Sequence, residues 1–287
     1  MHLLKGCFAT LILLLNVLVC VSTLLLVSLI KLLIPIPSIR RTIDPVLNAI
    51  AETWIAINSS WMQAVNSSPW QVEGVGELQQ HGWYLVSSNH QSWVDILVLQ
   101  RVFNRRIPLL KFFLKRELIY VPFMGLAWWA LDFPFMRRSG DPKGFQRDLA
   151  AARRACEHFS HVPTSVISFL EGTRFTTAKH DKQKSPYRHL LKPKTGGLAI
   201  ALSTLGEKFN SLIDVTIIYD GLAPNFWHLL SGQINNVQVV VQQRRIPPQF
   251  CQGNPTSDPA LRAELLKWIE SLWLEKDALI AARSAKL

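Results

Sequence analysis

The chain has 287 residues, a formal net charge of +11 and an apolar fraction of 49 %. This composition excludes a disordered or low-complexity protein and indicates a membrane link, in a chain long enough for one large or two small domains. The positive charge suits anionic lipid, an acidic substrate or nucleic acid, but the sequence has no ribonucleoprotein, zinc-finger or basic-zipper signature. No nucleic-acid partner is therefore expected.

The first predicted element is a membrane helix, because no charged residue occurs from Gly6 to Ile30. A run of this length spans a hydrocarbon core of about 30 Å. A signal peptide is the alternative, but the run is too long and lacks a small-x-small cleavage site. More cations follow the run (Lys31, Arg40, Arg41) than precede it (Lys5). This bias favours a cytoplasmic body, as at a bacterial inner membrane, although a helix that re-enters one leaflet is also consistent.

A second helix is predicted from Val46 to Val65, where apolar residues recur at three- and four-residue spacing. It would lie in the membrane interface or against the first helix; a core helix of the folded domain is the alternative. Residues 1–70 are thus predicted to form a membrane-anchoring helical module, and residues 71–287 an α/β domain. The basic run Arg101–Arg116 is either a solvated helix face or a contact for an anionic bilayer or an acyl carrier.

Strand-like and helical segments then alternate, which predicts an α/β fold with a mixed sheet flanked by helices. An interrupted apolar segment, Leu118–Phe135, is expected to be buried or membrane-facing rather than a second span. The predicted strands are Trp83–Ser88, Ser165–Leu170, Asp214–Tyr219 and Val237–Gln242, and the predicted helices are Gln146–Phe159 and an amphipathic one capped at Ser257-Asp258-Pro259.

The segment Asn89–Asp95 carries the first candidate chemistry. Residues five apart point about 140° apart on a helix, so His90 and Asp95 can meet only if His90 precedes the helix and Asp95 lies in its first turn. Ser92 with Asp95 fits a capping box, which by itself would explain the pattern without chemistry. A carboxylate on one imidazole nitrogen would instead leave the other free as a general base.

Two further segments are candidate sites. Phe169–Arg174 follows a predicted strand, where Gly172 permits a tight turn and Arg174 suits a phosphate or a carboxylate. A surface ion pair is the plainer interpretation. Phe135–Arg138 places cations directly after an apolar stretch, which indicates either interfacial anchoring or a grip on a lipid phosphate.

These segments, in this order, resemble the glycerolipid acyltransferases of the lysophosphatidic acid (1-acylglycerol-3-phosphate) acyltransferase family. The resemblance runs from about Trp83 to Tyr219. The family's His-x-x-x-x-Asp block matches His90 and Asp95, its arginine block ends at Arg138, its Glu-Gly-Thr-Arg block is Glu171–Arg174, and its last block is Val215–Ile218.

Several positions depart from the commonest family pattern. Leu170 and Thr216 replace prolines, and Asp132 stands where a glycine often occurs. None of these removes a reacting group, so they bear on the acceptor rather than on activity. The continuation Phe175–His180 looks like the branch with lysocardiolipin and other lysophospholipid acyltransferases. Lysophosphatidic acid is the first expected acceptor, and lysophosphatidylglycerol or lysocardiolipin the alternative.

The resemblance implies direct transfer of an acyl group from coenzyme A or acyl carrier protein to a lysolipid hydroxyl, without a metal or a bound cofactor. It implies that His90 is the base, that Asp95 orients it, and that substrate is held by Arg138, Glu171, Gly172, Thr173 and Arg174. A hydrolase is a weaker alternative, because no Gly-x-Ser-x-Gly elbow occurs. A membrane-tethered adaptor that keeps the fold is the other.

Overall fold

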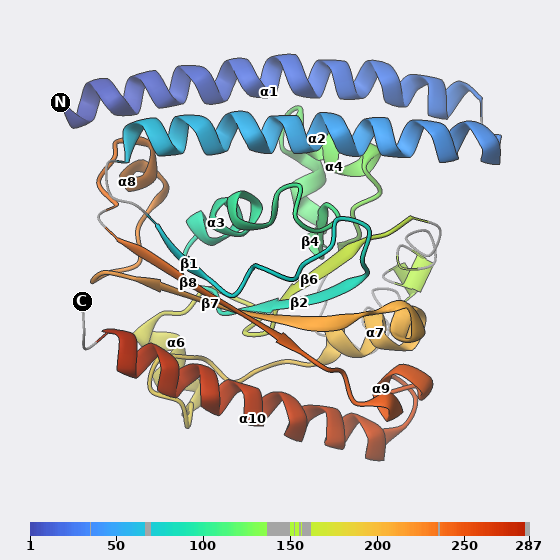
Figure 1. Ribbon diagram of the computed structural model, residues 1–287, viewed down its shortest axis with the longest axis vertical. Coiled ribbons are helices and arrows are strands. Elements are labelled where there is room, and N and C mark those ends of the chain that lie inside the picture. Colours follow the sequence, from blue (N-terminus) through green and yellow to red (C-terminus); the bar gives the residue numbers. More distant parts are fainter. Residues whose placement is uncertain are drawn as a thin grey trace.

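The computed structural model describes residues 1–34, 36–66, 70–136, 150–151, 153–154, 156, 162–234 and 236–284, apart from the side chains of residues 37, 38, 40 and 41. The protein has three layers, with helices on both faces of a central sheet (Figure 1). One helical layer holds α1 (His2–Leu33), α2 (Pro37–Val65), α3 (Val94–Phe103), α4 (Met124–Ala130) and α8 (Phe226–Leu230). The other holds α6 (Thr177–Gln183), α7 (Gly196–Leu205), α9 (Pro248–Gln252) and α10 (Pro259–Ser284).

The central layer is a six-stranded sheet with the order β1-β8-β7-β2-β6-β3. Its strands are β1 (Gln71–Glu73), β2 (Tyr84–Ser88), β3 (Leu110–Phe112), β6 (Ser165–Phe169), β7 (Ser211–Tyr219) and β8 (Val237–Arg244). Only the β7–β8 pair among these is antiparallel. The predicted mixed sheet flanked by helices is thus confirmed. A separate parallel pair joins β4 (Leu114–Lys115) to β5 (Phe135–Met136), and short 3-10 turns cover Arg116–Tyr120 and Gly206–Lys208.

The register of the central strands fixes where the site lies. Ser88, the last residue of β2, is opposite Phe169 at the end of β6 and opposite Val215 in β7. The carboxyl ends of β2 and β6 therefore meet at one edge of the sheet. In such sheets, residues that directly follow neighbouring parallel strands gather in space.

Strand β7 is buried along its whole length, as expected for a strand covered on both faces. Alternate residues face opposite helical layers, so that Asp214 and Thr216 point toward α10. There Lys276 of α10 forms an ion pair with Asp214 at 2.9 Å and approaches the Thr216 hydroxyl at 3.3 Å. Asp214 also accepts a hydrogen bond from Ser87 of β2. Thr216 thus contributes to the attachment of α10 to the sheet.

Helices α1 and α2 pack side by side in antiparallel directions (Figure 1). A polar contact lies inside this apolar pair: the Asn16 amide donates to the Trp54 carbonyl and to the Asn58 side chain, each at 2.9 Å. Paired polar groups of this kind fix the register of two apolar helices. The second helix begins at Pro37, earlier than predicted, because proline is favoured in a first helical turn.

Both ends of α1 are bonded to the rest of the protein. At the first end, His2 lies 3.0 Å from the Ser231 carbonyl, which follows α8. At the other end, Lys31 pairs with Asp44 of α2 at 2.9 Å and with Asp132 after α4 at 2.6 Å. Among the helices that the structure describes, α1 alone is long and apolar enough to cross a membrane. It lies along the α/β domain instead of projecting from it.

The remaining predicted elements are found in part. The interrupted segment Leu118–Phe135 contains one short α-helix, α4, which packs on α1 and lies between the 3-10 turn Arg116–Tyr120 and the start of β5. The C-terminal helix begins as expected, with the Asp258 carboxylate accepting the N–H groups of Ala260 and Leu261. Most of the helix predicted over Gln146–Phe159 lies outside the described residues.

Candidate active site

The turn after β2 is held in place by a side chain that substitutes for backbone pairing. Asn89 donates from Nδ2 to the Ile217 carbonyl at 2.9 Å and accepts the Ile217 N–H through Oδ1 at 2.8 Å. Asn89 is fully buried. The amide thus continues the β2–β7 ladder by one step and presents the next residue, His90, beyond the strand end.

His90 and Asp95 meet as their spacing predicts. His90 Nδ1 lies 2.9 Å from Asp95 Oδ2, with His90 in the turn and Asp95 in the first turn of α3. Because a carboxylate only accepts hydrogen bonds, the proton of the neutral ring lies on Nδ1 and Nε2 is an acceptor. Nε2 makes no hydrogen bond with any residue that the structure describes. The side chain of His90 is 12 % exposed.

Asp95 is completely buried and accepts four hydrogen bonds. Its Oδ2 accepts the N–H groups of Gln91 and Ser92, at 2.6 and 2.9 Å, besides the histidine ring. Its Oδ1 accepts the Tyr219 hydroxyl at 2.6 Å. Burial, followed by the nearby Asp95 charge, raises the pKa of Tyr219 well above its usual value, so the hydroxyl remains a donor. These contacts hold the Asp95 carboxylate in a fixed position facing the imidazole.

The predicted capping box takes a modified form. The Ser92 hydroxyl accepts the Val94 N–H at 3.1 Å and donates to the Pro224 carbonyl. Asp95 completes the reciprocal half of the box through the Ser92 N–H. Capping and histidine orientation are therefore served by the same carboxylate, and the two interpretations of this segment are not exclusive.

The imidazole also has a fixed plane. The rings of His90 and Phe169 stack with their centroids 3.9 Å apart and an angle of 13° between the planes. Phe169 ends β6, so the two strands whose carboxyl ends coincide supply both partners. With Asp95 on Nδ1 and Phe169 against one face, the direction of Nε2 is set by the protein alone.

Glu171 lies beneath the turn rather than on its surface. Its Oε1 accepts the His90 N–H at 2.7 Å, its Oε2 accepts the Leu191 N–H at 3.0 Å, and the residue is completely buried. Both carboxylate oxygens are thus occupied by backbone donors. This placement differs from the expectation that Glu171 contacts substrate, since its two bonds join the His90 turn to the chain before α7.

The rest of the Glu-Gly-Thr-Arg segment faces outward. Gly172 has φ +69°, a left-handed conformation that glycine adopts without strain. The Arg174 guanidinium lies 5.1 Å from the centre of the Trp93 ring, and Thr173 accepts a hydrogen bond from Lys179 at 2.8 Å. The Phe175 N–H donates to the His90 carbonyl at 2.7 Å. Both predicted segments therefore form one site at the edge of the sheet.

The arginine block is described only in part. Phe135 and Met136 form β5 beside β4, and their side chains are half-buried. Arg138 lies outside the described residues. In the last block, Val215 and Ile217 point toward the α1–α2 side of the sheet, and Thr216 points toward α10 as noted above.

The residues Asn89, Phe169 and Tyr219 complete the site but were not singled out by the sequence. The pairing of β2 with β6 and β7 brings Phe169 and Tyr219 to the turn that carries His90. Asn89 directly precedes His90, and Phe169 lies two residues before the Glu-Gly-Thr-Arg residues, so their positions in the sequence could have indicated a place in the site. Nothing in the sequence around Tyr219 indicates that it contacts Asp95.

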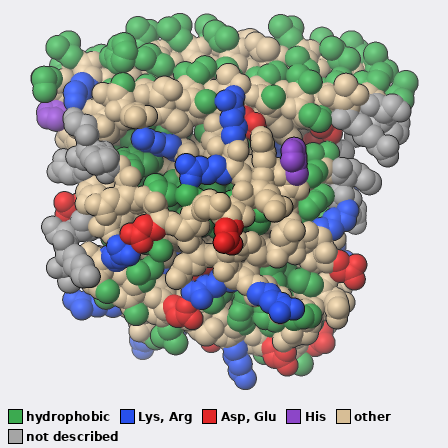
Figure 2. All heavy atoms as spheres, in the orientation of Figure 1, with side chains coloured by type: hydrophobic (Ala, Val, Ile, Leu, Met, Phe, Trp, Pro, Cys, Tyr) green, Lys and Arg blue, Asp and Glu red, His purple; other side chains and the backbone are tan. Residues whose placement is uncertain are grey.

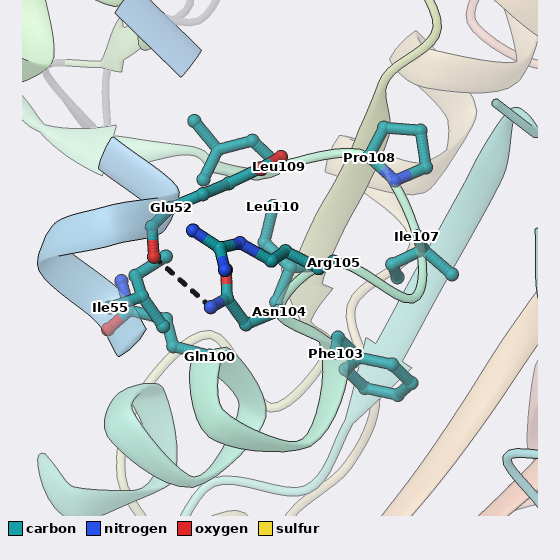
Figure 3. Close-up of a pocket in the computed structure, with 10 residues that line it drawn as sticks. All are labelled: Glu52, Ile55, Gln100, Phe103, Asn104, Arg105, Ile107, Pro108, Leu109 and Leu110. Atoms are coloured by element: carbon teal, nitrogen blue, oxygen red, sulfur yellow. Dashed lines mark hydrogen bonds between the residues drawn. The ribbon is translucent and has the colours of Figure 1, made fainter. Parts of the chain in front are cut away.

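Two adjoining pockets lie away from this site. The pocket in Figure 3, about 230 Å³, lies between α2 and the loop before β3, where the Asn104 amide donates to the Glu52 carbonyl at 3.1 Å. Arg105 extends toward Glu52 there (Figure 3); burial raises the pKa of that carboxyl and Arg105 opposes the rise. A larger pocket of about 480 Å³ shares Ile55, Gln100, Leu109 and Leu110 with it. The rest of its lining is mostly apolar and comes from α1, α2, α4, Leu131 and Phe133.

Burial of Glu171 predicts a pH-dependent stability. Desolvation raises its pKa from 4.5 to about 7, against the opposing effect of its two backbone hydrogen bonds. The folded protein therefore binds this proton more tightly than the unfolded chain, so the contribution of Glu171 to stability is greatest below pH 4.5 and is lost as the pH rises to about 7. Unfolding midpoints of detergent-solubilised protein should be lower at about pH 7.5 than at about pH 5.

In the Glu171→Gln protein this difference should shrink, because the group no longer titrates. The matched control is Glu264→Gln, a change at an exposed residue of α10 that should leave the difference unaltered. The same pH difference in wild-type and Glu171→Gln protein would contradict the assignment.

Comparison with known proteins gives the family. A family model described as Acyltransferase matches residues 70–220. Human 1-acyl-sn-glycerol-3-phosphate acyltransferase delta is 28 % identical over 208 residues, which cover 68 % of this chain and 51 % of that protein. The mouse gamma form is 29 % identical over 176 residues, covering 58 % of this chain and 43 % of that protein. The chain thus spans about half the length of the curated relatives it matches.

A solved structure gives the same fold. The crystal structure of the 1-acyl-sn-glycerophosphate (LPA) acyltransferase PlsC from Thermotoga maritima aligns with a TM-score of 0.56 and covers 98 % of each chain, at 20 % sequence identity. Its match extends over α1 and α2 as well as the α/β domain. Because the family model covers more than half of the 287 residues and contains the whole His90 site, the protein belongs to the acyltransferase family.

Proposed function

We propose that the protein transfers a fatty acyl group from an acyl thioester, on coenzyme A or acyl carrier protein, to the free hydroxyl of a lysophospholipid. The proposed main acceptor is lysophosphatidic acid, which would give phosphatidic acid and agrees with the names of the relatives. The observation that carries the proposal is the fixed His90–Asp95 pair with an unoccupied Nε2 at the sheet edge.

In this mechanism, His90 Nε2 accepts the hydroxyl proton as the oxygen attacks the thioester carbonyl. Asp95 stabilises the imidazolium that forms. As the tetrahedral intermediate collapses and the carbon–sulfur bond breaks, the imidazolium gives this proton to the departing thiolate, which regenerates the neutral His90. Most N–H groups at the start of α3 are taken, since those of Gln91 and Ser92 bond Asp95 and that of Val94 bonds Ser92. Trp93 retains an N–H without a partner among the described residues, and it is the proposed donor to the oxyanion.

The acceptor phosphate is proposed to lie by the outward face of the Glu-Gly-Thr-Arg turn. Arg174 and Arg138 supply the charge, and Gly172 and Thr173 shape the turn on which the phosphate rests. Glu171 acts indirectly, by fixing the turn. The lipid tail is proposed to lie along the apolar segment Leu118–Phe133, which contains α4 and lines part of the apolar pocket beside α1 and α2.

We propose that α1 lies in the plane of one leaflet. At 1.5 Å per residue it is about 48 Å long, and it packs along its length against α2, α4 and α8. Were it perpendicular to the bilayer, the attached polar domain would enter the hydrocarbon. Figure 2 shows hydrophobic side chains gathered along the α1 edge of the molecule. The exposed apolar residues at this edge include Leu11, Leu14, Leu15, Leu18, Leu26, Leu126, Trp129, Phe226 and Trp227.

This orientation predicts that both chain ends lie on the same side of the membrane. Epitope tags at the N- and C-termini should both be removed by protease added to that side of sealed vesicles, and both be protected from the other side. A helix that spans the bilayer would expose the two tags from opposite sides.

An acceptor panel tests the proposed function. Wild-type protein in vesicles receives labelled acyl-CoA, or labelled acyl carrier protein, with lysophosphatidic acid, lysophosphatidylglycerol or lysocardiolipin. Labelled phosphatidic acid as the main product supports the proposal, and a different main product names another acceptor. Background product with every donor–acceptor pair would reject the enzyme in favour of a membrane-tethered adaptor.

A further inference from the structure

A lysine outside the matched sequence blocks reaches the candidate active site. The Lys194 N–H donates to the Leu170 carbonyl at 2.7 Å, directly after β6. The neighbouring Leu191 N–H donates to Glu171, so the chain before α7 is bonded twice to the end of this strand. Lys194 is thereby held beside the turn that carries Gly172 and Arg174.

The Lys194 side chain lies over Gly172. A Cβ added at Gly172 would be 3.2 Å from Lys194 Cδ and 3.6 Å from Nζ. The absence of a side chain at Gly172 therefore leaves room for the lysine stem to cross the turn. The ammonium group comes to lie at the outer surface of the turn, close to its backbone.

The outer surface of this turn carries only positive charge among the described residues nearest to it. Lys179 bonds to Thr173 and to the Arg174 carbonyl, and Arg174 lies over the Trp93 ring. The one acid of the segment, Glu171, is buried beneath it. Lys194 is an exposed residue, and within the described ranges its Nζ has neither an acid at ion-pair distance nor a hydrogen-bond acceptor.

We propose that Lys194 binds a phosphate group of the substrate, together with Arg174, on the outer face of the Gly172 turn. An unpaired ammonium beside a guanidinium, with the local carboxylate turned away, provides charge-assisted donors for a phosphate. The phosphate belongs either to the lysolipid acceptor or to the coenzyme A donor. The inference rests on the proposed function, because it places that phosphate within reach of His90.

The test compares Lys194→Met with Lys192→Met, which removes the same charge two residues away from a side chain that is also exposed. Loss of one charge-assisted hydrogen bond should raise the KM of the bound substrate about tenfold or more in the Lys194→Met protein, with kcat changed much less. Lys194→Arg, which keeps the charge, should restore most of the affinity. Unfolding midpoints establish that all variants are folded.

The two sources of phosphate are separated by varying one substrate at a time. A raised KM for lysophosphatidic acid identifies the acceptor, and a raised KM for acyl-CoA identifies the donor. KM values that match those of Lys192→Met, or a loss confined to kcat, would overturn the inference.

A binding measurement tests the proposed phosphate site independently of the proposed acyltransferase activity. Equilibrium binding of lysophosphatidic acid and of coenzyme A to wild-type, Lys194→Met and Lys192→Met protein needs no turnover. Weaker binding in Lys194→Met alone supports the phosphate site even if the acceptor panel shows no product. Equal binding in all three proteins rejects it whatever the activity.

Discussion

The His90→Gln protein is expected to transfer acyl groups about 10²- to 10⁴-fold more slowly than the wild type, the range for loss of a general base. The His90 backbone donates to Glu171 and accepts from Phe175, and these two bonds survive the substitution. Glutamine keeps a polar side chain but cannot take a proton at neutral pH. The measurement is kcat/KM for lysophosphatidic acid and acyl-CoA with purified protein in vesicles.

The matched control is His81→Gln, which changes an exposed histidine in the turn before β2. It should leave kcat/KM unaltered. A His90→Gln protein that unfolds at the wild-type midpoint and keeps wild-type activity would show that Nε2 is not the base. A large activity loss in the His81→Gln protein would show that the assay responds to something other than the site.

Asp95→Asn is expected to have the second largest effect, an activity loss of about 10²-fold or more. The amide can keep its oxygen toward His90 Nδ1 and the N–H groups of Gln91 and Ser92, so the turn is preserved. What disappears is the buried negative charge that stabilises the imidazolium, which is worth more in a buried site than in water. The loss should fall on kcat, because no contact between Asp95 and substrate is proposed.

The Tyr219→Phe protein separates the effect of the Asp95 charge from the effect of its hydrogen bonds. It removes one hydrogen bond to Asp95 but leaves the carboxylate, so its effect on kcat should be clearly smaller than that of Asp95→Asn. Equal losses in the two proteins would mean that the hydrogen-bond network, and not the anion, accounts for the effect.

The sequence predicted the elements whose pattern is local. The apolar runs of β2, β6 and β7 are strands because both faces are buried, and His90 and Asp95 meet because a strand, a turn and a helix follow one another over a few residues. Such features depend on backbone geometry that short segments determine. For the same reason the C-terminal helix begins close to its predicted cap.

The features that the sequence did not reveal depend on packing between distant segments. Tyr219 reaches Asp95 from 124 positions along the chain, through the register of β7 against β2. Glu171 points inward because the N–H groups of His90 and Leu191 lie beneath the turn and donate to its carboxylate. The composition of α1 predicts its length and apolar character, but the contacts of His2 and Lys31 at its two ends decide its direction.

Release of coenzyme A from labelled acyl-CoA, followed before and after lysophosphatidic acid is added, tests whether the acyl group passes straight from the thioester to the lysolipid hydroxyl. Without acceptor we expect no release and no labelled protein, and with acceptor one labelled phosphatidic acid for each coenzyme A released. A burst of coenzyme A equal to the amount of protein before acceptor is present, or continuous release into free fatty acid, would contradict direct transfer.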